Sequence, residues 1–278
     1  MSRVVPRIER IDSLADSRVD PYRELREARL LDAQGLFVAE SRGVVRSLLG
    51  GRRFRVRSLL LADRALADLR PELERLADPP PVLLAPHARL CEIAGYSVHQ
   101  GCLALVERGA PVPLEALLRR ADSGRGLIVG IERLADPANV GSVFRNAQAF
   151  GADAVLLAPG GAEPLLRKAV RVSMAATLEV PFARVGDWPA GLEKLRAEGY
   201  PILACVTDRG ALPLERFDRD ASRVVLLFGN EGHGLDAATV AAADAALTIP
   251  MADGADSVNV ATASGIVLHH FARTRSAS

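Results

Sequence analysis

The chain has few cysteines, and their spacing suits neither a metal site nor a disulfide framework. Its three cysteines, Cys91, Cys102 and Cys205, are far apart, and none belongs to a C-x-x-C pair. The five histidines are scattered as well. Because structural zinc sites and disulfide frameworks need regular ligand spacings, we expect no metal and no disulfide.

The sequence also lacks a long apolar run. No stretch approaches the ~20 apolar residues that a membrane span needs. The first 18 residues have no apolar core of the signal-peptide type, and acidic residues stand among their arginines. We therefore expect a soluble, cytoplasmic protein with no membrane association.

The known nucleotide-binding fingerprints are absent too. The glycines at 229, 232 and 234 run G-x-x-G-x-G instead of G-x-G-x-x-G, and no G-x-x-x-x-G-K-[ST] occurs. No Ser/His/Asp catalytic set is indicated either. These absences disfavour a nucleotide-dependent enzyme of the doubly wound type.

The composition is that of a globular protein of one large domain or two smaller ones, with 278 residues, 49% apolar and 25% charged. The net charge is +1, but residues 1–110 carry 18 arginines against 15 acidic residues. Residues 111–278 are slightly acidic in balance. This distribution permits nucleic-acid binding by the first half without requiring it.

Periodicity predicts two α/β domains. A polar N-terminal extension over residues 1–20 precedes a small domain over 21–108, and the proline-rich residues after Gly109 indicate a linker over 109–125. Strands and helices alternate over residues 126–278, which predicts a parallel sheet covered on both faces. In the first domain we expect strands over 36–39, 52–61, 82–84 and 101–106, and helices over 21–33, 40–49, 63–77 and 86–94. In the second we expect strands over 127–131, 154–158, 180–185, 202–206, 224–228 and 246–249, and helices over 139–150, 164–176, 188–198, 235–243 and 257–273.

The stretch Val224–Leu235 could hold a ligand. A buried strand of five apolar residues ends at Phe228, and three glycines in the next six residues let the backbone take unusual angles and approach a ligand closely. Glu231 places one carboxylate in this turn. An ordinary glycine-rich turn explains the same residues equally well.

Two more stretches lie where strands give way to helices. In Asp136–Ala147, Asn139 can cap a helix that carries Arg145, whose simplest alternative is a solvent-facing or acid-paired arginine. In Ile249–Val260, Ser257 is most simply a helix cap, and Asn259 falls in the first turn, where backbone N–H groups are free.

Together, these three stretches resemble the three motifs of the SpoU (TrmH) family of SPOUT RNA methyltransferases. The resemblance spans residues 127–273 and rests on order, spacing and placement at strand ends. It is carried by Asn139-Val140-Gly141 with Arg145-Asn146-Ala147, by Phe228-Gly229-Asn230-Glu231-Gly232 with Gly234-Leu235, and by Ile249-Pro250-Met251 with Ser257-Val258-Asn259-Val260-Ala261.

This resemblance implies a parallel-sheet SPOUT domain with a deep trefoil knot, which no residue pattern would suggest by itself. It implies transfer of a methyl group from S-adenosylmethionine to a ribose 2′-hydroxyl of structured RNA, ribosomal RNA first and transfer RNA second, with a resistance role left open. It also implies a homodimer. The domain over 21–108, which contains His99-Gln100-Gly101, resembles more loosely the small RNA-binding domain of many members.

The resemblance assigns roles by position. Arg145 would be the main catalytic residue, holding a phosphate by a bidentate contact, and Glu231 would orient its guanidinium. Since arginine stays protonated, we favour positioning and electrostatic stabilisation over proton abstraction. Asn139, Ser257 and Asn259 would assist. The cofactor would lie against Phe228, Gly229, Asn230, Ile249, Met251, Val258 and Asn259.

Arg52, Arg53, Arg55 and Arg57 are candidates for phosphate contacts in the first domain. A solvated strand edge kept from aggregating by its charge explains them equally well. The alternative function is a SPOUT-fold RNA-binding protein that has lost catalysis. The joint presence of Arg145, Glu231 and Asn259 argues against it.

Overall fold

The computed structural model describes residues 6–23, 34–120, 126–217 and 223–272. It divides the chain into two compact units. The first unit contains Met1–Ala110 together with Glu163–Leu178, and the second contains Pro111–Ala162 and Glu179–Ser278. The segment Glu163–Leu178, which the sequence analysis assigned to the second domain, therefore packs with the first.

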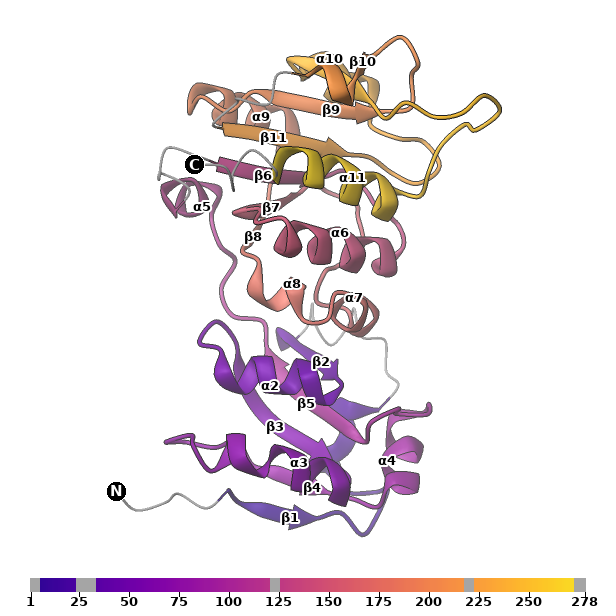
Figure 1. The fold of residues 1–278 in the computed structure, drawn as a ribbon. Helices are drawn as coiled ribbons and strands as arrows, with labels where there is room; N and C mark the ends of the chain where they lie inside the picture. Colours follow the sequence, from indigo (N-terminus) through magenta and orange to yellow (C-terminus); the bar gives the residue numbers. More distant parts are fainter. Residues whose placement is uncertain (1–5, 24–33, 121–125, 218–222, 273–278) are drawn as a thin grey trace. The chain divides into compact units, whose positions relative to one another are not determined.

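The first unit is a five-stranded mixed sheet with helices (Figure 1). The strand order is β1-β4-β3-β5-β2, in which β1, β4 and β3 are parallel and β5 runs antiparallel to both β3 and β2. Its strands are β1 (Ile8–Arg10), β2 (Leu36–Glu40), β3 (Arg55–Leu61), β4 (Val82–Leu84) and β5 (Cys102–Glu107). Its helices are η1 (Ser17–Tyr22), α2 (Arg42–Gly50), α3 (Asp63–Leu73), α4 (His87–Ala94) and α7 (Arg167–Val172).

The second unit contains a seven-stranded sheet in which every described pairing is parallel. The strand order is β10-β12-β9-β11-β6-β7-β8. Its strands are β6 (Gly126–Ile131), β7 (Ala154–Leu157), β8 (Phe182–Arg184), β9 (Ile202–Val206), β10 (Leu212–Pro213), β11 (Arg223–Phe228) and β12 (Ala245–Thr248). Its helices are α5 (Leu114–Arg120), α6 (Pro137–Ala149), α9 (Trp188–Ala197), η2 (Leu214–Arg216), α10 (Ala237–Ala242) and α11 (Val260–Ala272). Helix α8 (Ala176–Glu179) lies at the boundary, with all but Glu179 in the first unit.

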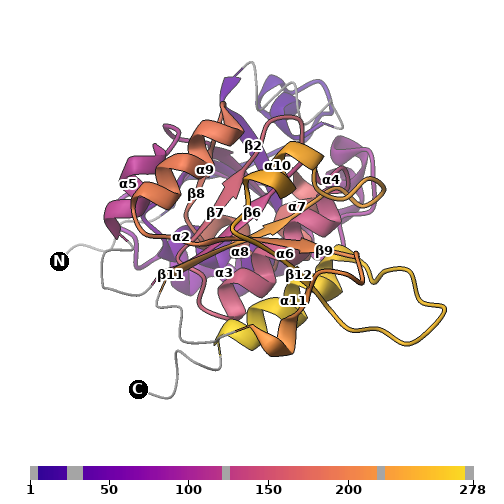
Figure 2. The ribbon, with the colours of Figure 1, turned by 90° about the horizontal axis from the view of Figure 1, so that it is seen from above.

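Helices cover both faces of this sheet, as the alternating pattern predicts (Figure 2). On one face, α5, α9 and the end of α10 pack against buried residues of the central strands. On the other face, α6 and α11 pack against each other. The α/β class with a parallel sheet is confirmed, and the knot stays a prediction.

Two expectations about the chain's boundaries are wrong. Residues 109–125 do not form a plain linker, because α5 lies within them and buries Leu114 and Leu117 in the core of the second unit. The helix expected over 164–176 is split into α7 and α8. No described helix combines the length and apolar character needed to cross a membrane.

The described part of the N-terminus is not an extension. Strand β1 pairs in parallel with β4, and Ile11 and Val19 are buried. Strand β1 has three residues, and one of them is apolar. It is too short to show the alternation of apolar and polar residues from which a strand is predicted, so the sequence analysis missed it. The helix expected over 21–33 differs as well, because a 3₁₀ helix ends at Tyr22 and residues 24–33 lie outside the described residues.

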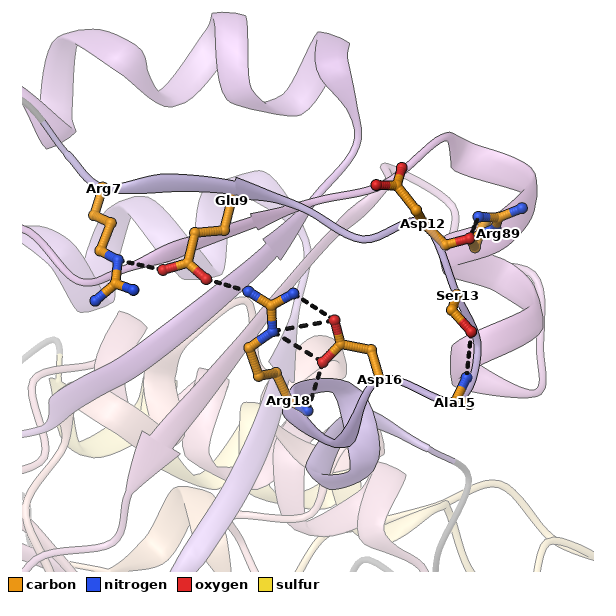
Figure 3. Close-up of polar contacts among 8 residues, drawn as sticks. All are labelled: Arg7, Glu9, Asp12, Ser13, Ala15, Asp16, Arg18 and Arg89. Atoms are coloured by element: carbon orange, nitrogen blue, oxygen red, sulfur yellow. Dashed lines mark hydrogen bonds and ion pairs between the residues drawn. The ribbon is translucent and has the colours of Figure 1, made fainter.

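Ion pairs fasten this N-terminal strand to the helix that follows it (Figure 3). Arg18 lies between the carboxylates of Glu9 and Asp16 and bonds to both. Asp16 also caps the 3₁₀ helix by accepting from the Arg18 backbone N at 3.0 Å. Hydrogen bonds from the Arg18 side chain and then its backbone N lower the pKa of Asp16 to about 2.

We expect Arg18→Gln to return the titration of Asp16 towards the ordinary aspartate range. A lowered folded-state pKa means that the stabilisation is present above the unfolded value of 3.8 and is lost as the pH falls towards 2. Carboxyl NMR titration of both proteins measures the change. An unchanged Asp16 midpoint in the variant would contradict this account.

Candidate active site

A cavity of about 560 Å³ opens at the carboxyl ends of β9, β11 and β12. Parallel strands bring their carboxyl ends to one edge of the sheet, which is the usual ligand site of open α/β folds. Residues at the ends of all three strands and in the loops after them line the cavity. They include all seven residues predicted to bind the cofactor: Phe228, Gly229, Asn230, Ile249, Met251, Val258 and Asn259.

The glycine-rich loop after β11 is a closed turn. The backbones of Asn230 and Gly234 exchange two hydrogen bonds of 2.9 Å. Inside the turn, the Asn230 side-chain oxygen accepts from the backbone N of Gly232 and of His233. The backbone after Gly229 returns so closely that a Cβ at that position would lie 2.1 Å from the Gly234 carbonyl carbon. The first glycine is therefore required by sterics.

Glu231 joins this loop to the start of α6. Its carboxylate accepts from the backbone N of Ala135 at 3.0 Å and of Asp136 at 3.2 Å, and from Asn139 Nδ2 at 2.8 Å. Partial burial acts to raise the pKa of Glu231, but these hydrogen bonds together outweigh it and hold the pKa below its ordinary value.

We expect Glu231→Gln to lower the free energy of unfolding by about 1 kcal/mol at pH 7, since an amide replaces one of the two accepting oxygens with a donor. The lowered pKa makes the carboxylate's contribution complete above pH 4.5 and lost as the pH falls further. The difference in the free energy of unfolding between variant and wild type should therefore become smaller in acid. Urea unfolding at pH 7 and pH 3.5 tests this, and a difference that became larger in acid would refute it.

Asn139 and Asn259 connect the first stretch to the third. Asn259 Nδ2 donates to Asn139 Oδ1 at 3.2 Å, so the three stretches meet in one chain of hydrogen bonds through Glu231, Asn139 and Asn259. The expected capping roles are wrong in detail. Asp136 caps α6 by accepting from the backbone N of Ala138, and Asn139 lies inside the helix.

The expected cap at the last helix is also wrong. Helix α11 begins at Val260, and Asn259 Oδ1 accepts from the backbone N of Ala261 at 2.8 Å. Ser257 instead is exposed in the preceding loop, where it lines the cavity. The loop before the helix is polar and has no clear helical period. The helix was therefore predicted to start at Ser257, three residues before its observed start at Val260.

Arg145 lies on an exposed part of α6 and does not line the cavity. No described residue of the same chain makes a hydrogen bond or ion pair with its side chain. The expectation that Glu231 orients the guanidinium is not met within one chain, because Glu231 bonds to Asn139 and to backbone instead.

Two residues next to the site have structural roles that the sequence analysis did not assign. Glu132, 4% exposed, follows β6 and accepts from the Asp236 backbone N and the Thr239 hydroxyl, which fixes the start of α10 just beyond the glycine-rich loop. Asn146 donates to the Ala261 carbonyl at 2.7 Å and so ties α6 to α11. An acidic residue directly after an all-apolar strand was the available signal for Glu132.

The four candidate RNA-binding arginines are all exposed in the first unit. Strand β3 begins only at Arg55, so Arg52 and Arg53 precede it. Arg55 and Arg57 pair with Glu107 of β5 at 3.8 and 3.2 Å. Pairing of β3 with β4 begins only at Leu59, so Arg55 and Arg57 have a neighbouring strand on the β5 side alone. The alternative of a charged strand edge therefore still fits this part of β3.

The described residues contain no group of three or more His, Cys, Asp or Glu that could hold a metal ion.

Comparison with known proteins identifies relatives of both units. The sequence profile of the SpoU rRNA Methylase family matches residues 126–269. An uncharacterized tRNA/rRNA methyltransferase of Mycobacterium bovis is 37% identical over 94% of this chain and 90% of its own length. The crystal structure of an AdoMet-bound rRNA methyltransferase from Sinorhizobium meliloti superposes with a TM-score of 0.80 at 26% identity, over 98% of this chain and 99% of that one.

A third relative carries a more specific name. The 23S rRNA (guanosine(2553)-2′-O)-methyltransferase RlmP of Bacillus subtilis is 34% identical over 140 residues. The match covers 50% of this chain and 55% of RlmP.

Proposed function

The chain belongs to the SpoU rRNA Methylase family, and from that membership we propose that it methylates a ribose 2′-hydroxyl of structured RNA. S-adenosylmethionine-dependent RNA methylation is the activity of the family it belongs to. One observation carries the finer proposal: the three motif stretches converge through Glu231, Asn139 and Asn259 beside the cavity. We propose ribosomal RNA as the first substrate and transfer RNA as the second, a choice supported by the names of the relatives.

The cavity suits S-adenosylmethionine. Its volume of about 560 Å³ lies within the range of small-molecule sites. Phe228, Leu247 and Val267 contribute apolar walls for an adenine ring and a methionine chain, while the turn at Gly229 brings backbone groups to the same wall. When bound, the cofactor supplies an activated methyl group on sulfur.

The chain's own residues would position the acceptor, the ribose 2′-hydroxyl. The glycine-rich loop and the segment around Val258 fix one wall of the cavity, and Glu231 holds both through Asn139 and Asn259. A ribose hydroxyl must be held in line and its developing negative charge stabilised. A guanidinium does both when it binds the adjacent phosphate with two parallel hydrogen bonds, and we assign that role to Arg145.

The placement of Arg145 supports a homodimer. Its side chain is exposed and lies outside the lining of its own chain's cavity. A second copy that presents Arg145 to the cavity would complete the site. We therefore propose the homodimer as the active species, with the first unit, Arg52 to Arg57 included, holding the RNA.

Mapping of 2′-O-methylation tests the proposal. Ribosomal and transfer RNA are compared between cells with and without the gene, and the purified protein is then given the unmodified RNA with labelled S-adenosylmethionine. One ribose methylation should disappear in the cells and return in vitro. A methyl group found on a base would overturn the 2′-hydroxyl assignment. Calorimetric failure to bind S-adenosylmethionine would favour a catalytically inactive RNA-binding protein.

A further inference from the structure

Glu40, at the carboxyl end of the edge strand β2, is a buried carboxylate in the first unit. Only 2% of the residue is exposed, and its Oε2 accepts no hydrogen bond in the described structure. Two guanidiniums lie close to that oxygen, Arg167 at 4.0 Å and Arg171 at 3.8 Å. Both arginines belong to α7, which contacts β2. A buried charge destabilises the fold unless it is paired. Pairing with Glu40 therefore holds both arginines at the carboxyl end of β2.

The two arginines are held differently. Arg167 lies over the ring of Tyr96, with its guanidinium carbon 3.7 Å from the ring centroid, and its side chain is 26% exposed. Arg171, one helical turn later, is 54% exposed. Lys168, three residues before Arg171, is exposed too, and residues spaced by three lie side by side on a helix. Lys168 and Arg171 are therefore two exposed, neighbouring cations on a helix that Glu40 and Arg167 hold against β2.

The other end of the segment Glu163–Leu178 contacts one of the predicted RNA-binding arginines, Arg53. Arg53 donates to the Leu178 carbonyl at 3.4 Å, and its guanidinium also lies 5.0 Å from the Phe54 ring centroid. Phe54 packs edge-on against Phe37, near the start of β2. Cations thus flank both ends of the edge strand β2. Its five residues span about 17 Å at ~3.3 Å per residue.

We propose that Lys168 and Arg171, together with Arg52 and Arg53, form one phosphate-binding surface for RNA along β2 of the first unit. The proposal rests on the proposed function, which makes RNA the substrate. It adds that the segment Glu163–Leu178, which interrupts the methyltransferase domain in sequence, carries part of the RNA-binding surface. Such phosphate contacts give position and salt-dependent affinity, not sequence choice.

The test compares double variants of the full-length protein on one RNA probe, in vitro transcribed unmodified 23S rRNA. Lys168→Gln/Arg171→Gln and Arg52→Gln/Arg53→Gln should each weaken binding about tenfold near 0.1 M salt and reduce the salt slope by about one to two. The matched control is Arg64→Gln/Arg70→Gln, which removes two exposed arginines from α3, a helix that packs on α2 and β3. The control should match wild type. Thermal unfolding and S-adenosylmethionine calorimetry confirm that each variant is folded.

The outcomes separate this inference from the proposed function. If the Lys168/Arg171 variant keeps the affinity and salt slope of the Arg64/Arg70 control while wild type methylates the probe, the surface is wrong and the function stands. A second outcome is that wild type binds the probe, and the variants reduce the salt dependence of that binding, but wild type transfers no methyl group to any rRNA or tRNA. The proposed surface is then supported and the proposed function is wrong. Wild type that neither binds nor methylates any of these RNAs overturns both.

Discussion

Arg145→Lys is expected to lower kcat by at least ~10²-fold, the loss typical when one positioned donor to a developing oxyanion is removed. Lysine keeps the positive charge but offers a compact ammonium in place of the planar fork that binds a phosphate through two hydrogen bonds. Because we assign Arg145 to the RNA phosphate and not to the cofactor, S-adenosylmethionine affinity should change little. Thermal stability should change little as well, because the side chain is exposed. Steady-state methylation of unmodified RNA, with calorimetry of the cofactor, measures both.

Arg64→Lys is the matched control, since Arg64 is also exposed on a helix but lies in the first unit. It should retain wild-type turnover. Turnover of Arg145→Lys near that of wild type would show that only a positive charge is needed and would remove the bidentate role. A large loss of cofactor affinity would instead place Arg145 in the cofactor site.

The position of the cavity at the carboxyl ends of the strands was largely predictable from the sequence. Parallel strands bring their carboxyl ends together, and the resemblance of the loops after Phe228 and near Ile249 to SpoU motifs placed both in one site, where they line one cavity. The α/β class followed from the alternation of strands and helices. Both inferences depend on short-range patterns that the tertiary structure preserves.

Contacts between distant residues could not be predicted in this way. Glu231 was expected to reach Arg145, but its partners lie on the backbone before α6 and on Asn139. Which donor a carboxylate finds depends on how two loops approach, and no periodicity encodes that. Glu40 shows the same limit, since its arginine neighbours are more than 120 positions away along the chain.

Gly229→Ala is expected to abolish measurable S-adenosylmethionine binding and to destabilise the protein by about 1–3 kcal/mol, the usual cost of overpacking. A Cβ at this position would lie 2.1 Å from the Gly234 carbonyl carbon and 2.2 Å from the Leu235 backbone N. These are backbone atoms, so no side-chain rotation relieves the overlap. The turn must open, which displaces the wall of the cavity that Phe228 and Asn230 form. Calorimetry and thermal unfolding measure the two effects.

Gly232→Ala, in the same loop, isolates the steric cause. A Cβ at that position would meet only the Asn230 side-chain oxygen, at an ordinary 3.6 Å, and Gly232 is not among the glycines with positive φ. The backbone N of Gly232 keeps its hydrogen bond to Asn230 in either case. This variant should therefore keep cofactor affinity within a few-fold of wild type. If both alanine variants lost binding equally, mobility of the whole loop, and not the close approach at Gly229, would be the property that the cofactor requires.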